Sequence, residues 1–343
     1  MVRIFCFLNI WVNQMIYLVV LSKKLEFFNS AGQSWKKLNI KKIVNNLDFS
    51  VKVISFDELD DIIFLSNDIL IYTSSENPEV RQFIKNKLYY IKDKCVLIPS
   101  YDLLMAHEDK GFQEVMKKEK SFGNLKGGYI FDIDNHQFNY PKVLKTAQGA
   151  GSSGVFLVKD NADLKTIKNK FFEPNLKRKI IKLQRKFKLS PEEYLIYSYK
   201  YKRFNLFVEQ EFISNLACDF KVLVFGDRYF VLKRNVRKND FRASGSGDFE
   251  FIDPPIEVLD FAKEIAEVLK NPYLSLDIAQ SDKGCHLIEF QASNFGPYTL
   301  LNAPFRYIKV ENNWRQEENC RDLESNYAYA LNYFLKNLLN CNK

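Results

Sequence analysis

The sequence predicts a mixed α/β protein in which a small sheet–helix unit precedes a body built from β-hairpins. Three patterns support this prediction. Short apolar runs alternate with polar helical stretches from residue 15 to about residue 105. A glycine-rich loop at 149–154 separates two strand-like runs, and two further strand pairs follow at 219–233 and 274–291.

The first unit alternates strand-like with helix-like segments, which is typical of a small, mostly parallel sheet. Apolar runs give the expected strands, at Ile16–Leu21, Val51–Ser55, Ile69–Thr73 and Lys94–Ile98. Polar stretches between them give the expected helices, at Leu38–Leu47 and Pro78–Ile91. We therefore predict an N-terminal α/β domain at residues 1–105 and a larger body at 106–343.

The first 21 residues are strongly apolar and leave two interpretations open. A signal peptide or a short membrane anchor would suit such a run. Against this, Asn9, Asn13 and Gln14 interrupt the run, and no small-residue cleavage site follows. We favour buried strands of the opening unit and expect no stable membrane insertion. Met15 is an alternative start of the chain.

Composition and charge bound the partners and the compartment. The chain has 343 residues and a formal charge of +8, from 50 basic and 42 acidic residues. This modest excess suits an anionic ligand such as a nucleotide, and by itself gives no reason to expect nucleic-acid binding. Six cysteines are scattered without CxxC pairs, at Cys6, Cys95, Cys218, Cys285, Cys320 and Cys341. This scatter argues against a zinc ribbon or a disulfide scaffold, so we expect a cytoplasmic protein.

Residues 274–291 predict a β-hairpin that carries a metal site. Apolar and polar residues alternate on both sides of a three-residue turn at 282–284, whose glycine suits a positive φ. This register places Asp277 opposite Glu289, with Gln291 on the same face. Like charges placed opposite each other repel unless a cation lies between them, and such oxygen ligands suit Mg²⁺. A solvated hairpin face with ordinary acidic residues is the alternative.

A second strand pair, at 219–226 and 229–233, ends in a cluster of cations. Its members are Lys233, Arg234, Arg237, Lys238 and Arg242. Cations at strand ends, on the approach to a carboxylate-bound metal, are what a triphosphate site needs. The two strand pairs together therefore predict a site for a nucleoside triphosphate and its metal ion.

The loop at 149–154 spells GxGxxG, but its context differs from that of a dinucleotide-binding loop. The dinucleotide fingerprint needs a helix after the loop, whereas the strand-like segment 155–158 follows here. A glycine loop between two strands is instead a flap whose backbone N–H groups can fold over phosphates. Lys145, at the end of the preceding strand, would neutralise charge beneath it. A protein kinase is disfavoured because no His-Arg-Asp or Asp-Phe-Gly segment follows. A plain flexible hairpin tip is the alternative.

A basic helical stretch interrupts the body at about 173–205. Lysines and arginines are dense between Lys177 and Lys188, and Ser190-Pro-Glu-Glu193 is typical of a capped helix start. The simpler interpretation is a solvated insertion, and the other is a docking surface for an anionic partner or substrate at 177–203. Three packing helices are also expected, at 161–172, 255–270 and about 322–339.

The order of these motifs resembles the ATP-grasp superfamily, and within it the RimK-type ligases near the tubulin-tyrosine-ligase-like enzymes. The resemblance covers about residues 105–300. It rests on Gln210-Glu-Phe-Ile213, Asp219-Phe-Lys-Val-Leu-Val-Phe-Gly226, Lys233-Arg234, Asp240-Phe-Arg242, Asp277 and Glu289-x-Gln291. It implies an ATP-grasp fold with a small Rossmann-like domain in front. It also divides the body into a glycine-loop part at about 106–207 and a metal-binding part at 208–343.

The resemblance implies roles for individual residues, with ATP and Mg²⁺ as cofactors and Mn²⁺ as an alternative metal. The residues it assigns to ATP are Lys110, Lys145, Gly149, Gly151, Ser152, Ser153, Gly154, Glu209, Gln210, Glu211, Phe212 and Asp219. It assigns the metal to Asp277, Glu289 and Gln291, and catalysis to Lys233 and Arg242. The segment 207–213 would link the two halves of the nucleotide cleft. We interpret His107, before a helix that runs to about Lys120, as a surface residue.

The activity implied is formation of an amide or peptide bond from a small-molecule or peptide carboxylate and an amine, through an acyl phosphate. A kinase that releases a phosphorylated product and a nucleotide-binding module without catalysis are the alternatives. Three departures from the family pattern favour the module. They are Gln291 in place of Asn, Ala243-Ser244 in place of x-Asn after Arg242, and Lys221 in place of Arg.

Overall fold

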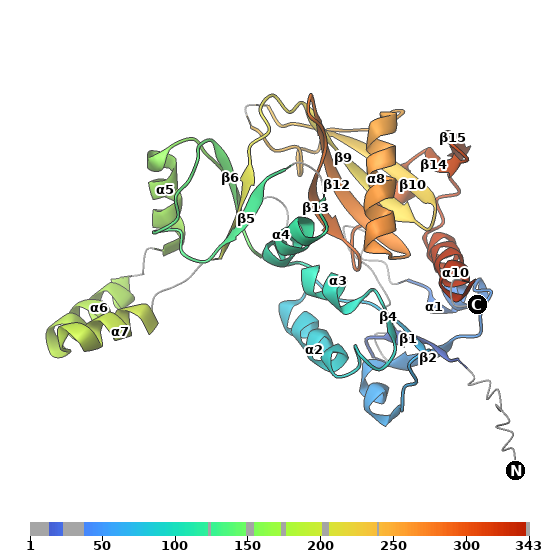
Figure 1. The fold of residues 1–343 in the computed structure, drawn as a ribbon, viewed down its shortest axis with the longest axis horizontal. Helices are drawn as coiled ribbons and strands as arrows, with labels where there is room; N and C mark the ends of the chain where they lie inside the picture. The colour runs from blue at the N-terminus through green and yellow to red at the C-terminus, as the bar shows by residue number, and fades with distance from the viewer. Residues whose placement is uncertain are drawn as a thin grey trace, which may run out of the picture.

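The computed structural model describes residues 14–22, 38–122, 125–148, 154–172, 176–200, 206–238 and 240–340. These residues form a four-stranded, a seven-stranded and a second four-stranded sheet, which we call the first, large and third sheets. In Figure 1 the first sheet lies at the bottom, the large sheet at upper right and the third sheet at left. Of the apolar run at the N-terminus, residues 1–13 lie outside the described part.

The first sheet has the order β2-β1-β3-β4, and every neighbouring pair is parallel. Its strands are β1 (Ile16–Val20), β2 (Lys52–Ser55), β3 (Ile69–Tyr72) and β4 (Val96–Ile98). Its helices are α1 (Ile40–Asn45) and α2 (Pro78–Tyr89), with a 3₁₀ turn η1 (Phe56–Asp61) and the helix α3 (Tyr101–Ala106). The predicted parallel sheet is therefore confirmed, with the fully buried runs β1 and β3 at its centre and β2 and β4 at its edges. The sequence did not predict η1 or α3.

The third sheet is antiparallel in the order β5-β8-β6-β7 and is covered by α5. Its elements are β5 (Gly127–Ile130), β6 (Lys142–Thr146), β7 (Val155–Val158), α5 (Asn161–Phe172) and β8 (Phe207–Glu211). The strand pair around the glycine loop and the helix at 161–172 are confirmed. The segment expected to be a linker at 207–213 is mostly strand β8, in the interior of this sheet.

The large sheet runs β13-β12-β9-β10-β14-β15, and β11 also pairs with β10. Its strands are β9 (Cys218–Phe225), β10 (Arg228–Asn235), β11 (Phe249–Glu250), β12 (Tyr273–Ser281), β13 (Gly284–Gln291), β14 (Phe305–Val310) and β15 (Asn313–Glu318). The helices are α4 (Lys110–Glu119), α8 (Ile256–Leu269), α9 (Tyr298–Asn302) and α10 (Leu323–Asn340). Both predicted strand pairs and the helices near 255–270 and 322–339 are confirmed.

Each strand of the large sheet turns alternate side chains to two different environments. Val222 and Val224 of β9 pack with α8 in one apolar cluster. Leu223 and Phe225 face the other way and join the first sheet and α10 in a second cluster. On this second face the apolar residues give way to charged ones toward Asp219. One face of the sheet is therefore part core and part site.

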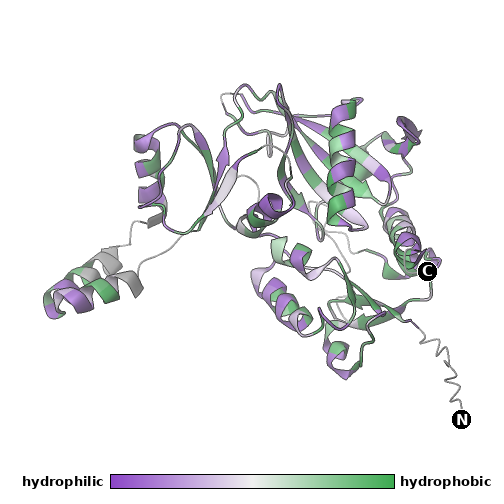
Figure 2. Cartoon of the chain, in the orientation of Figure 1, coloured by the Kyte–Doolittle hydropathy of each residue, from purple (hydrophilic) through white to green (hydrophobic). Residues whose placement is uncertain are grey.

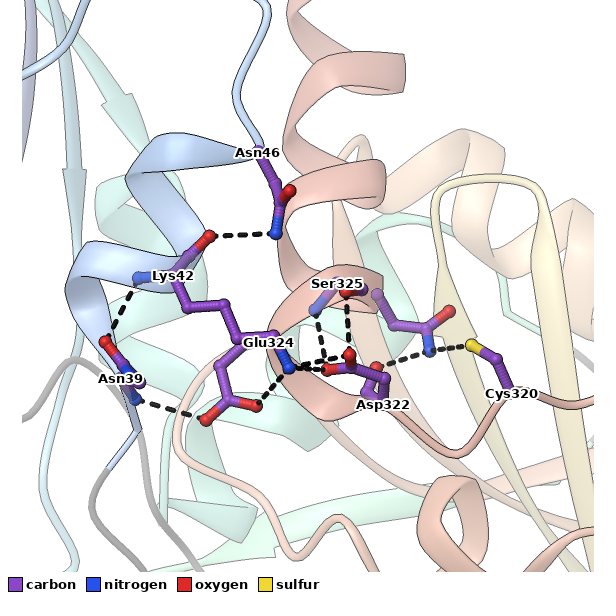
Figure 3. A network of polar contacts seen from close by, with 8 residues as sticks. Asn39, Lys42, Asn46, Cys320, Asp322, Glu324 and Ser325 are labelled. Carbon is purple, nitrogen blue, oxygen red and sulfur yellow. Dashed lines mark hydrogen bonds and ion pairs between the residues drawn. The ribbon is translucent and has the colours of Figure 1, made fainter.

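The first sheet is joined to the end of the chain by polar contacts between α1 and α10 (Figure 3). Lys42 Nζ lies 2.6 Å from Asp322 Oδ2 and 3.8 Å from Glu324 Oε2. The Asn39 backbone N–H donates to Glu324 Oε1 at 3.1 Å. These exposed pairs contribute little energy individually, but together they fix the orientation of α1 on α10.

The basic stretch forms two helices, α6 (Leu176–Lys188) and α7 (Pro191–Lys200). The predicted cap is confirmed, because Ser190 N–H donates to Glu193 Oε2 and Glu193 N–H donates to Ser190 Oγ. Figure 1 shows this helix pair apart from the three sheets, and Figure 2 shows hydrophobic and hydrophilic residues mixed along it. Within the described part of the chain, no helix is both long and apolar enough to cross a membrane.

Candidate active site: a charged cleft between two sheets

A cleft of about 280 Å³ lies between the third sheet and the large sheet. Val143, Lys145 and Gln210 line it from the third sheet. Strands β9, β10, β12 and β13 of the large sheet supply five charged side chains, which are Asp219, Lys221, Arg234, Asp277 and Glu289. Other charged lining residues are Glu76, Glu108, Lys110, Glu211 and Arg242. Because the five charged residues of the large sheet lie on regular strands, their positions follow directly from strand pairing.

Lys221, Asp277 and Glu289 form a row across three neighbouring strands. Lys221 pairs with Asp277 between β9 and β12, and Asp277 pairs with Glu289 between β12 and β13. The Lys221 ammonium donates to Asp277 Oδ1 at 3.1 Å. The predicted juxtaposition of the two carboxylates is therefore confirmed, with a cation on one side of it.

Arg234 is the central cation of the cleft floor. Its guanidinium donates to both oxygens of Asp219, at 2.6 and 2.9 Å, and its Nη2 lies 3.0 Å from Asp277 Oδ2. Burial alone would raise the pKa of Asp277, but Arg234 and Lys221 outweigh burial and hold that pKa well below its usual range. Asp277 is therefore ionised and already neutralised by two cations.

The hairpin that carries Asp277 and Glu289 differs from its predicted form. Its turn has two residues instead of three, since Ser281 pairs with Gly284, and Gly284 has a φ of +106°. A β-bulge follows, because Ile278 pairs with Leu287 while the next residue, Asp277, pairs with Glu289. The turn is one residue shorter than predicted, and the bulge adds one residue to β13. Asp277 therefore still pairs with Glu289, as predicted.

Helix α4 holds this bulge in place. The bulge residue, Ile288, accepts a hydrogen bond from Lys117 Nζ at 3.2 Å, and Lys117 is also paired with Glu114 at 2.7 Å. The backbone N–H of Phe290 donates to the buried Gln113 side chain at 3.3 Å. The outer edge of β13 thus finds partners on both sides of Glu289, and Glu289 is held facing the cleft.

Lys145 is the buried cation on the opposite wall. It lies on β6, and 6% of its surface is exposed. Burial lowers its pKa to about 8, with Lys117 adding to this effect and Glu289 opposing it. Lys110, at the start of α4, lies on the same side, with its Nζ 3.8 Å from Glu289 Oε1. The two lysines form a cationic wall above the carboxylates, which suits a polyphosphate.

We expect nucleotide affinity to depend on pH through Lys145. Phosphates would raise its pKa above 8, so binding takes up a proton and affinity is fully present below pH 8. Above pH 8 the affinity should fall, by at most about tenfold per pH unit. Calorimetry at pH 7 and 9 measures this, and Lys145→Arg should abolish the dependence.

Removing the Lys145 cation gives a second readout. Lys145→Met should weaken nucleotide binding by about 1.5–3 kcal/mol, which is typical of a charge-assisted hydrogen bond. Lys142→Met is the matched control, because Lys142 is on the same strand with its side chain on the opposite face. Equal losses of nucleotide affinity in Lys145→Met and Lys142→Met would show that Lys145 does not contact the nucleotide.

Gln291 is tied to a histidine that the sequence analysis placed at the surface. His107 is 1% exposed, and its Nδ1–H donates to Gln291 Oε1 at 3.0 Å. Burial lowers the pKa of His107 to about 4, so the ring is neutral near pH 7. The surface interpretation of His107 is therefore wrong, because packing against the end of β13 encloses it.

The donor chemistry around Glu289 fits a hard cation only in part. Among the described residues, no group of three or more His, Cys, Asp and Glu side chains is arranged to hold a metal ion. Asp277 is bound to Lys221 and Arg234, whereas Glu289 is 29% exposed. Gln291 Oε1 accepts from His107 Nδ1 at 3.0 Å and, at the longer distance of 3.5 Å, from the Glu108 backbone N–H. Glu289 is therefore the oxygen donor most accessible to Mg²⁺, and phosphate and water oxygens would complete the shell of the ion.

The structure brings most of the predicted site residues together. Those that line the cleft are Lys110, Lys145, Gly154, Gln210, Glu211, Phe212, Asp219, Arg242, Asp277, Glu289 and Gln291. Gly154 approaches β6 so closely that a Cβ would lie 2.0 Å from the Thr146 hydroxyl. The predicted residues Gly149, Gly151, Ser152 and Ser153 lie outside the described part of the chain.

Two predicted residues lie outside the cleft lining. Lys233 is on the opposite face of β10 from Arg234, and its ammonium lies 3.2 Å from Glu250. Glu209 is 3.2 Å from His136 Nε2 and likewise faces away from Gln210. In both cases strand alternation decides which neighbour enters the cleft.

Arg242 connects the two walls. It is paired with Asp240 at 2.6 Å, and its Nη1 donates to the Val155 carbonyl of β7 at 3.4 Å. The ring of Phe241 meets that of Phe212 edge-on, with centroids 6.2 Å apart. The loop after β10 therefore contacts the third sheet beside the glycine loop.

Sequence reasoning gave no individual site role to Arg234, Lys221 or Asn294, although all three line the cleft and Arg234 was part of the predicted cation cluster. A signal for Arg234 was present, because Arg234 on β10 pairs directly with Asp219 on β9, so both side chains lie on the same face of the sheet. Asn294 follows β13, and its buried Oδ1 has no hydrogen-bond partner among the described residues. No local pattern pointed to Asn294.

Comparisons with known proteins address the fold. No protein-family model matches the sequence, and no curated protein does. Among solved structures, D-cycloserine synthetase is similar over 93% of this chain and 98% of its own, with 9% identity and a TM-score of 0.52. D-alanine–D-alanine ligase from Bacillus anthracis complexed with ATP is similar over 96% and 98%, with 13% identity and a TM-score of 0.49.

A third similar structure is the RiPP-associated ATP-grasp ligase of Chryseobacterium gregarium, in complex with ADP and a leader and core peptide. It covers 92% of this chain and 95% of its own, with 13% identity and a TM-score of 0.49. At these identities the likeness concerns architecture, and the match to D-cycloserine synthetase carries it. The chain has the ATP-grasp fold that the order of its motifs predicted.

Proposed function

We propose that the protein is an ATP-dependent ligase that joins a carboxylate to an amine. The observation that carries the proposal is the facing pair of charged walls, with Lys110 and Lys145 opposite Asp277 and Glu289. Such a cleft suits a triphosphate and a metal ion, and it supports transfer of the γ-phosphoryl group. The division into domains at about residue 105 and at 207/208 belongs to the same proposal.

The reaction follows from these charges. A carboxylate oxygen of the substrate attacks the γ-phosphorus of ATP, the bond to the β,γ-bridging oxygen breaks, and ADP leaves. The amine then attacks the acyl phosphate, its carbon–oxygen bond breaks, and phosphate leaves as the amine loses a proton. Lys145 and Arg242 neutralise the phosphoryl oxygens, while Arg234 fixes Asp219 and Asp277 so that the cleft floor does not reorganise.

Mg²⁺ would be held by Glu289 together with phosphate oxygens, and Gln291 could join by giving up its long hydrogen bond from the Glu108 N–H. Bound there, it would neutralise charge on the β- and γ-phosphates. The same residues do not distinguish Mg²⁺ from Mn²⁺, since both prefer oxygen ligands.

Nucleotide preference is the first test of this proposal. Calorimetry should detect binding of Mg-ATP and not of NAD, because the glycine loop is flanked by strands β6 and β7.

Hydroxylamine then serves as a general amine, since it converts any acyl phosphate to a hydroxamate. Hydroxamate that forms only with ATP and a carboxylate supports a ligase. ADP release that needs no amine and gives a stable phosphorylated product indicates a kinase, and tight NAD binding without an ATP response contradicts the proposal.

The helix pair α6–α7 suits an anionic partner or substrate at the periphery. Arg185, Lys186 and Lys188 are exposed on α6, beside the exposed Phe187. The Arg185 guanidinium lies 5.8 Å from the Tyr197 ring of α7, which links the two helices. Because these cations lie outside the cleft lining, they suit capture of a charged partner better than chemistry.

Neutralising this surface should leave the nucleotide site intact. In the triple variant R185Q/K186Q/K188Q we expect the affinity for Mg-ATP to stay within about twofold of the parent. An anionic partner should associate more slowly with the variant than with the parent at low salt, and at the same rate at high salt, where charges are screened. Calorimetry with Mg-ATP measures the first effect. A lost ATP response in a folded variant would place α6 inside the active site instead.

A further inference from the structure

A second cavity, of about 420 Å³, adjoins the nucleotide cleft. Lys221, Arg234 and Gly296 line both cavities, so the two meet at the row of charges on the sheet. The second cavity extends from this junction between β10, β11 and the short helix α9. A molecule in it can reach the charged row from the side opposite to the lysine wall.

The second cavity is charged at one end and apolar along its length. Leu232 pairs with Lys221 between β10 and β9, so both side chains are on the same face of the sheet. Phe249, on β11, and Tyr298, on α9, form a tilted ring pair with centroids 5.8 Å apart, and Leu301 completes the apolar wall. Among the described lining residues none is acidic, and the only cations are at the junction.

One polar group shows where a ligand could find hydrogen bonds. The Lys221 ammonium has three N–H donors, and its side chain is 26% exposed although it is paired with Asp277. A carboxylate at this ammonium would accept a charge-assisted hydrogen bond.

We propose that this cavity binds the body of the carboxylate substrate, and that the substrate is a monocarboxylic acid with an apolar body. Its carboxylate lies at Lys221, beside the phosphate end of the cleft, and its hydrocarbon part packs between Leu232, Leu301 and the Phe249–Tyr298 pair. A second carboxylate on the body would lose its water in a cavity with no cation at that end, which disfavours diacids. The proposal deepens the ligase function and rests on it for the chemistry.

Binding is tested without turnover, using Mg²⁺ and a non-hydrolysable ATP analogue. The probes are butyrate, hexanoate and octanoate, each compared with the diacid of equal carbon number: succinate, adipate and suberate. Burial of each added methylene should tighten monoacid binding by about fourfold. Each diacid should bind at least about tenfold more weakly than its monoacid.

Wall variants tie this preference to the cavity. Tyr298 and Phe249 are 47% and 39% exposed, so Tyr298→Ala and Phe249→Ala should fold. Each should weaken octanoate binding by about tenfold and leave affinity for the ATP analogue unchanged. Tyr90→Ala, an exposed tyrosine on another element, should change neither. Diacids that bind as tightly as monoacids, absence of binding by every acid, or equal effects of Tyr298→Ala and Tyr90→Ala would overturn the proposal.

A hydroxylamine trap with Mg-ATP separates this proposal from the ligase function. If octanoate binds with the expected chain-length dependence but no acid gives a hydroxamate, the cavity assignment stands and the ligase function fails. If hydroxamate forms with succinate and not with octanoate, the ligase function stands and the apolar substrate class is wrong.

Discussion

Replacing Glu289 by Gln should lower ATP-dependent ADP release by more than about 100-fold at any Mg²⁺ concentration. Loss of a group that only orients a metal ligand already costs about 10- to 100-fold, and Glu289 would be the ligand itself. Asp277 cannot substitute for it, because both of its oxygens are bound to cations, Lys221 and Arg234. Gln keeps the size of Glu and removes the charge, so the loss reports on the charge.

The measurement is ADP release against Mg²⁺ concentration, combined with calorimetry of ATP without metal. Metal-free ATP should bind to Glu289→Gln as well as or better than to the parent, since a carboxylate near Lys110 and the phosphates is gone. Glu264→Gln, an exposed residue on α8, is the matched control. Gln291→Asn should retain activity because it still offers an amide oxygen. If Glu289→Gln released ADP at the normal rate while Gln291→Asn were inactive, Glu289 could not be the main metal ligand.

Replacing Arg234 by Met should lower the free energy of unfolding by about 3–5 kcal/mol at pH 7. The substitution leaves the buried Asp219 without its bidentate partner and deprives Asp277 of one of its two cations. Arg306→Met is the control. Arg306 donates twice to one oxygen of Glu317, Oε2, and that pair is 18% and 21% exposed, so we expect a loss of about 1 kcal/mol or less.

The pH dependence of this loss has a definite sign. In the parent, the depressed pKa of Asp277 stabilises the fold above the unfolded pKa, near 4, and this stability is lost on acidification through the folded pKa. Burial already raises the pKa of Asp219 in the parent, and Arg234 opposes this effect. Removing Arg234 would raise that pKa further, so acid stabilises the variant. The deficit should therefore shrink between pH 7 and pH 5 in urea unfolding. A deficit that grows in this range, or that matches Arg306→Met, would show that Arg234 is not the buried counter-charge.

The sequence predicted the parts of the site that follow from strand alternation and motif order. Asp277 and Glu289 could be paired because both ends of their hairpin carry clear alternation. The bulge at Ile288 could not be predicted, since its partner Lys117 comes from a helix 171 residues earlier in the chain. The resemblance assigned catalysis to Lys233, whereas the pairing of Arg234 with Asp219 places Arg234 on the face of β10 that enters the cleft.

The burial of His107 also depends on contacts that are distant in the sequence and could not be predicted locally. A histidine before a polar helix start carries no local signal for burial, and its enclosure depends on contacts with Gln291, which is 184 residues away. The central strands β1 and β3, by contrast, were predicted because each is a continuous apolar run, which suits a strand buried on both faces. Prediction succeeded where local pattern and tertiary environment agreed.

One face of the large sheet carries both apolar core residues and the charged residues of the cleft, and this limits how the cleft can open. Lys221 is on the same strand as Leu223 and Phe225, and Asp277 is on the same strand as Tyr273, all of which are held in the apolar cluster with α10. Opening these strands locally would disrupt that cluster, so the cleft floor belongs to the parts of the molecule that open last. Any widening of the cleft to admit a nucleotide must therefore come from displacement of the third sheet, while the floor stays still.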